Sequence, residues 1–205
     1  MSTWTSKLYR FGGVWGLCAV LAGCVTTTMG QAAPRSVRVA DGSLVLTAPN
    51  GFCVDQKASQ GDGSFVLFGN CAALSANPSL RQPGQPVVLT AAVSAPAPVP
   101  VAKALPQMKE FFQSEAGRAA LSRSGKAASV TVLGMRTEDD LLLVHLRDTA
   151  AASGPRVAAE YWRAFTGIEG RILSLSVLPL RDRPVSDANQ RALILAFVRA
   201  IRAAN

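Results

Sequence analysis

The sequence predicts an α+β fold in which helices pack on an antiparallel sheet. Several short segments alternate apolar and polar residues, as strands do, and two longer segments carry apolar residues at helical spacing. Four of the strand segments follow one another with short polar connections, as in a meander. With 205 residues, of which 49% are hydrophobic and 17% charged, the chain can bury a core. We therefore expect one ordered domain over residues 37–205.

The domain is predicted to begin with short strands and turns. Residues 37–47 alternate weakly around Asp41-Gly42, a dipeptide typical of hairpin turns. A polar loop that contains Gly61-Asp62-Gly63 precedes a short buried strand at 64–68. Another strand is expected at 87–93, after a proline-rich loop.

Residues 94–100 are the one low-complexity stretch, in which proline alternates with alanine and valine. Alternating prolines favour an extended polyproline path. We interpret the stretch as a surface connector between a strand and a helix. A domain boundary and a docking segment for an aromatic groove on a partner are the alternatives.

Two helices are expected. From Lys103 the apolar residues lie on one helical face, and the spacing predicts a continuous helix that ends near Ser124, with Gly125 as its stop. A second helix is predicted over residues 187–203, capped by Ser186. Its apolar stripe consists of Leu193, Ile194, Phe197 and Ile201.

The segment between the helices predicts four consecutive strands. They are expected at residues 129–135, 141–147, 156–165 and 172–179. This order of elements resembles that of the PsbP-like fold family over residues 37–203. Members of that family pack helices on an antiparallel sheet, and the resemblance implies a layered sandwich with an accessory or assembly role.

Residues 1–23 resemble the signal peptide of a bacterial lipoprotein. Lys7 and Arg10 precede an apolar run that is shorter than the roughly 20 residues of a membrane-spanning helix. The run ends in Leu21-Ala22-Gly23-Cys24, which resembles the lipobox that precedes the lipidated cysteine. The resemblance implies that Cys24 receives a diacylglyceryl group, becomes the first mature residue and carries acyl chains such as palmitate.

Residues 24–36 are predicted to form a flexible tether between this anchor and the domain. Cleavage near Gly30-Gln31-Ala32, which would give a soluble exported protein, is one alternative, and an uncleaved membrane anchor is another. Val25 after the cysteine favours the outer membrane by the sorting rule of enterobacteria. We expect a cell-envelope protein, held by lipid on a membrane that faces the periplasm.

Two cysteines remain in the domain, and export would place them in an oxidising compartment. A bridge between Cys53 and Cys71 would close a loop of about 18 residues, which the chain-entropy model values at roughly 3 kcal/mol. Both cysteines have apolar neighbours, and the Cys-x-x-Cys spacing of redox pairs is absent. The sequence therefore predicts a structural disulfide.

His145 is the only imidazole in the chain. Period two places it on the same strand face as Leu141 and Leu143, whereas Asp148 lies on the other face, so no local catalytic pair is implied. We interpret His145 as a structural strand histidine. The acidic run at 138–140 is at an expected hairpin tip and is interpreted as a solvated turn rather than a cation site.

The sequence nominates no catalytic residue, metal site or cofactor. It contains no Gly-x-Ser-x-Gly elbow, phosphate loop or EF-hand pattern. The formal net charge is +8, yet no basic cluster is interleaved with aromatic residues, and export argues against nucleic-acid binding. Four arginines lie in or beside the predicted strands: Arg147, Arg156, Arg163 and Arg171. They are either scattered over the surface or share one face, which would meet anionic lipid or an acidic partner.

These observations favour a membrane-anchored periplasmic lipoprotein without catalytic activity, which acts as an accessory, assembly or envelope-interaction factor. Its expected partners are a membrane, through Cys24, and a protein in a membrane complex. A periplasmic module that binds a small ligand is the alternative, and a hydrolase that uses His145 is the third. Trp162 is either a core residue or part of a contact surface.

Overall fold

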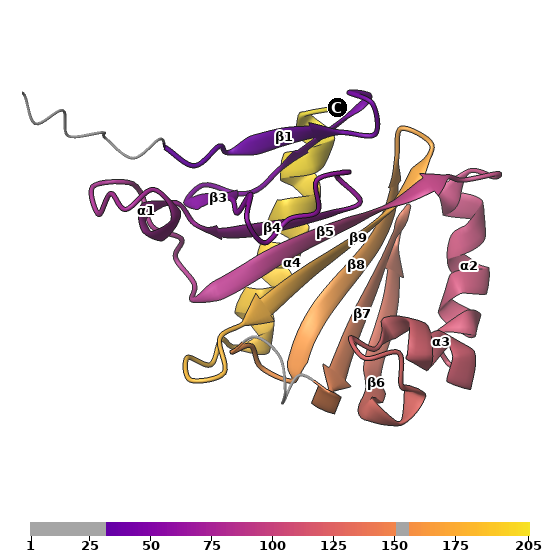
Figure 1. The fold of residues 1–205 in the computed structure, drawn as a ribbon. Helices are drawn as coiled ribbons and strands as arrows, with labels where there is room; N and C mark the ends of the chain where they lie inside the picture. The colour runs from indigo at the N-terminus through magenta and orange to yellow at the C-terminus, as the bar shows by residue number, and fades with distance from the viewer. Residues whose placement is uncertain (1–31, 151–155) are drawn as a thin grey trace, which may run out of the picture.

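Seven strands form one antiparallel sheet in the computed structural model, which describes residues 32–150 and 156–205 (Figure 1). Their order across the sheet is β3-β4-β5-β9-β8-β7-β6. The strands are β3 (Phe52–Val54), β4 (Phe65–Asn70), β5 (Val87–Pro96), β6 (Val130–Glu138), β7 (Leu141–Asp148), β8 (Glu160–Ile168) and β9 (Arg171–Pro179). The last four form the predicted meander, and the predicted α+β class is confirmed. The proposed cleavage site and Cys24 lie outside the described residues.

One face of the sheet is covered by α4 (Asp187–Ala203) and by a separate hairpin of β1 (Ser36–Val39) and β2 (Leu44–Thr47) (Figure 1). Apolar side chains of α4 pack on β8 and β9 because they recur at helical spacing. The Asn205 amide exchanges two hydrogen bonds with the Val45 backbone, at 2.8 and 2.9 Å, and so fastens the hairpin to the end of α4.

The opposite face is covered by α2 (Val101–Phe111) and α3 (Glu115–Leu121) over β6, β7 and β8 (Figure 1). β7 is buried on both faces, which explains its nearly continuous leucine run. Leu141 and Leu143 face α4, and Leu142, Val144 and Leu146 face α2 and α3.

The continuous helix predicted from Lys103 to Ser124 is wrong. The chain leaves the helix after Phe111, and Ser114 starts α3 by accepting a hydrogen bond from the Gly117 N–H at 3.0 Å. The apolar spacing continues through the break because both short helices place their apolar sides on the same sheet. An ideal Cβ at Gly117 would lie 1.9 Å from the Phe111 carbonyl oxygen, so this approach requires glycine.

The predicted disulfide between Cys53 and Cys71 is formed. Cys53 is in β3, and Cys71 begins α1 (Cys71–Leu74), directly after β4. The bridge thus links β3, at the edge of the sheet, to α1. This helix directly follows β4, the strand that pairs with β3. Both cysteines are buried, in agreement with a structural role.

The two edges of the sheet differ. β3 has three residues, and its Val54 N–H donates to the Pro34 oxygen at 2.7 Å, so the segment that precedes β1 covers this edge. β6 has nine residues, and β7 is its only ladder partner among the residues that the structure describes. In the described ranges, no helix is both long enough and apolar enough to cross a membrane.

Candidate functional site

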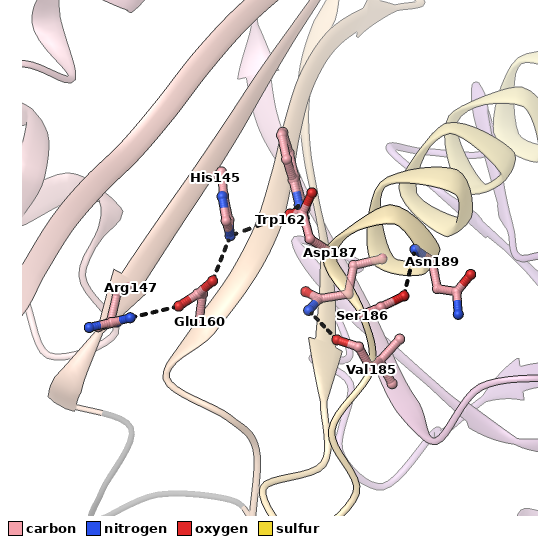
Figure 2. A network of polar contacts seen from close by, with 9 residues as sticks. His145, Arg147, Glu160, Trp162, Val185, Ser186, Asp187 and Asn189 are labelled. Carbon is pink, nitrogen blue, oxygen red and sulfur yellow. Dashed lines mark hydrogen bonds and ion pairs between the residues drawn. The ribbon is translucent and has the colours of Figure 1, made fainter.

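His145 stacks on Trp162 on the α4 side of the sheet. The two residues are directly opposite each other in the β7–β8 ladder, their ring centroids are 4.8 Å apart, and the ring planes differ by 4°. The Trp162 Nε1–H donates to Asp187 Oδ1 at 2.6 Å, at the start of α4. Trp162 is therefore a core residue with its polar end tied to the helix (Figure 2).

Two carboxylates lie beside the same nitrogen of His145. Nε2 is 3.1 Å from Glu160 Oε1 and 3.6 Å from Asp187 Oδ1, although neither contact has hydrogen-bond geometry. The other Glu160 oxygen accepts a 2.8 Å hydrogen bond from Arg147 Nη2. Figure 2 shows how β7, β8 and α4 contribute to this network, in which two acids face a guanidinium and an imidazole.

The N-terminus of α4 holds Asp187 in place. Ser186 Oγ accepts from the Asn189 N–H at 3.3 Å, as an N-cap does (Figure 2). Asp187 follows in the first turn, where the helix dipole favours a negative charge. The cap signal was visible in the sequence, but the contact between Asp187 and His145 requires the tertiary structure.

The network lacks the arrangement that nucleophilic catalysis requires. A triad places an acid on one imidazole nitrogen and a hydroxyl on the other, whereas both acids here lie beside Nε2. Within residues 32–150 and 156–205, Nε2 of His145 has no hydrogen bond from or to a serine or threonine hydroxyl. Nor do the described His, Cys, Asp and Glu side chains form a group of three or more that could hold a metal ion.

A second cluster lies on the opposite face, around the fully buried Tyr161. The Arg123 guanidinium is 4.4 Å from the Tyr161 ring centroid, and the Arg123 N–H donates to Asp148 Oδ2 at 2.8 Å. Arg163 donates to Ser176 Oγ at 3.1 Å and to the tyrosine hydroxyl at 3.3 Å. These contacts join the end of α3 to the sheet, which is a structural role.

The strand arginines do not share one face. Arg147 pairs with Glu160 on the α4 side, whereas Arg163 donates to the Leu121 oxygen of α3 on the other side, at 3.2 Å. The single arginine patch considered from the sequence therefore does not form from these two residues.

The acidic run at 138–140 lies at the predicted hairpin tip and is partly exposed, but two of its acids form ion pairs, so it is not only a solvated turn. Glu138 Oε1 is 2.6 Å from Arg191 Nη2, and Asp140 Oδ1 is 2.6 Å from Arg202 Nη2. The cations paired with this run are thus two arginines of α4. Arg191 and Arg202 are 53 and 62 residues later in the chain than the acids they contact.

A groove lies between the edge strand β6 and the helices α2 and α3, and no sequence pattern indicates it. Its cavity volume is about 510 Å³. Apolar side chains and two cations line it, and no acidic residue does. The lining residues are Lys109, Phe112, Gln113, Arg118, Val130, Thr131, Val132, Gly134 and Met135.

Comparisons with known proteins give distant structural similarities only. No protein-family model and no curated protein sequence matches the chain. The Ran-binding protein Mog1p of Saccharomyces cerevisiae is similar with a TM-score of 0.42 and 10% identity, over 80% of this chain and 92% of that chain. The cyanobacterial PsbP of Synechocystis is similar with a TM-score of 0.35 and 14% identity, over 79% and 88%. Such scores add no argument about what this chain binds or does.

Proposed function

We propose that the protein is an exported lipoprotein that acts by binding a partner rather than by catalysis. The observation that carries the export part is the buried disulfide between Cys53 and Cys71, because such bridges persist in oxidising compartments. The lipobox-like Leu21-Ala22-Gly23-Cys24 supports the anchor, with Cys24 as the acylated residue. Several acyl chains on one cysteine hold a protein firmly at a membrane.

The non-catalytic part is supported by how the polar residues are used. The His145 network joins strands to α4, and the Tyr161 cluster joins α3 to the sheet, so both sets of ionisable groups serve the fold. The groove beside β6 supplies the binding surface. We prefer this role to the small-ligand module because apolar side chains pack between the sheet and α4, and the groove on the other face lies along the edge strand β6.

The anchor is tested by the mass of the N-terminal peptide of the mature protein made in a Gram-negative host, with Cys24→Ser as the matched control. We expect an acylated peptide that begins at Cys24 and is absent from the control. An unmodified peptide that begins near Ala33 would contradict the anchor and leave a soluble exported protein. An uncleaved chain that begins at Met1 would contradict the cleavage.

A further inference from the structure

The edge strand β6 directs part of its backbone away from the sheet. In β7, the Asp148 N–H donates to the Ala159 oxygen on the β8 side, at 2.8 Å. The direction of the backbone groups alternates along a strand, so Arg147 and His145 direct theirs toward β6. This alternation identifies the β6 residues that are bonded to β7.

The β6 residues opposite these two are Thr131 and Gly134, which use their N–H and C=O groups on β7. The groups of Val132, Met135 and Thr137 consequently point outward. Within residues 32–150 and 156–205, no strand pairs with this side of β6, and no hydrogen bond outside the β6–β7 ladder uses these groups. An unpaired edge of this kind is a template for another strand.

The groove beside this edge has a mixed polar and apolar lining, with two cations and no acidic residue. Lys109 and Arg118 line it, and neither forms an ion pair within the described residues. Arg136, on β6 itself, is 3.9 Å from Glu138, an acid whose same oxygen lies 2.6 Å from Arg191 Nη2. The edge therefore presents cations that local acids neutralise little, and an acidic ligand complements them.

Two other occupants fit this charge less well. A second copy of the chain, paired edge to edge, would bring the same cations together. The chain's own segment at residues 25–35 contains no acid. Its end also lies at the opposite edge of the sheet, where the Pro34 oxygen bonds to Val54 (Figure 1).

We infer that β6 and its groove bind an extended acidic segment of a partner protein, which adds to the sheet as an eighth strand. Backbone hydrogen bonds to Met135 and Thr137 supply affinity. Alternate side chains of the segment enter the groove, where acids meet Lys109 and apolar groups meet Phe112. The inference rests on the proposed binding role and names the class of partner.

The probe is a displayed library of random twelve-residue peptides, selected on the purified full chain. We expect enriched peptides to be net acidic and to alternate acidic with apolar residues. The dissociation constant of the best synthetic peptide is then measured by calorimetry, and hydrogen exchange of the β6 amides is compared with and without it. Binding as a strand slows exchange at Val132, Met135 and Thr137.

Two pairs of variants test the contacts. Thr137→Pro removes an outward N–H without removing a bond to β7, and Thr137→Val keeps that N–H. Lys109→Glu reverses a charge in the groove, and Lys103→Glu reverses one on the same helix outside it. We expect Thr137→Pro and Lys109→Glu each to weaken binding about ten-fold or more, and each control to change it less than about two-fold. Circular dichroism of each variant verifies the fold.

The inference is overturned if no peptide is enriched on the wild type above the Thr137→Pro variant, if the enriched peptides are basic, or if a bound peptide leaves β6 exchange unchanged. A sedimentation experiment that shows dimers of the chain alone, abolished by Thr137→Pro, would assign the edge to a second copy and overturn it as well. The N-terminal peptide is analysed separately, so an unmodified Cys24 contradicts the anchor alone and leaves this result standing.

Discussion

The partners of His145 are up to about 40 residues away in the sequence, and its ring stacks on that of Trp162. Its side chain is 18% exposed, whereas Glu160 and Asp187 are 39% and 59% exposed. The solvent screens ion pairs of such exposure, so the stack and the buried ring contribute more to stability than the charges do.

Replacement of His145 by alanine is expected to lower the free energy of unfolding by about 1–2 kcal/mol, because the stacked ring is lost. Arg147→Ala, which removes only an exposed ion pair, is expected to cost less than about 0.5 kcal/mol. Urea denaturation followed by tryptophan fluorescence measures both. Equal values for the two variants would show that the stack contributes nothing of its own.

The loop before β4 contains a carboxylate with a shifted pKa. Hydrogen bonds from the Ser64 N–H and then from its hydroxyl hold the pKa of Asp62 below its usual value. The lowered pKa favours the folded state above the ordinary pKa of aspartate, and this contribution is lost as the pH falls through the lowered value.

Ser64→Ala is expected to raise the pKa of Asp62 but not to its usual value, because the backbone N–H, the larger cause, remains. Titration of the carboxyl carbon by NMR measures the change. A pKa that does not move would contradict the role of the hydroxyl, and Ser59→Ala in the same loop is the control.

The helices illustrate what local sequence predicts and what it does not. The extent of α4 was predictable because Ser186, the apolar stripe and the late arginines agree. The break between α2 and α3 was not, because the apolar spacing passes through it. The signals that mark it, Ser114 as a cap and Gly117 at a close approach, also occur inside ordinary helices.

Gly117→Ala tests this break directly. In an unconstrained helix the substitution stabilises by up to about 1 kcal/mol. At this position the new methyl group would overlap the Phe111 carbonyl, so we expect a loss of more than about 2 kcal/mol in thermal unfolding. Gly134→Ala, which has nothing within 4 Å of the added carbon, is the control and is expected to be nearly neutral. A stabilised Gly117→Ala protein would contradict the close approach.

At the scale of the whole molecule, the order of the strand segments predicted the meander. The two cysteines of the domain, with the expected export to an oxidising compartment, predicted their bridge. The groove beside β6 was not predictable, because it depends on where α2 and α3 cross the sheet and on which strand is last in its order. The same reason applies to Glu138 and Asp140, whose partners are known only once α4 is placed.

Replacement of both Cys53 and Cys71 by alanine is expected to lower the free energy of unfolding by roughly 3 kcal/mol, the value for a loop of 18 residues. Urea denaturation measures the loss. A reducing agent should bring the wild type close to the variant and leave the variant unchanged. Wild-type stability that does not respond to complete reduction, verified by thiol titration, would contradict the stabilising role.

The sheet is held at one edge by the segment that leads back toward residue 24 and offers a free strand at the other (Figure 1). A pull between a membrane anchor and a partner on β6 would act across the strands, along their hydrogen bonds, and would load these bonds pair by pair. The chain enters the domain before β1, so the load reaches the seven-stranded sheet through the hydrogen bond between Val54 and the Pro34 oxygen. The ladder at that edge is β3 with β4, which the disulfide reinforces. The disulfide thus lies at the edge of the sheet where such tension would enter it.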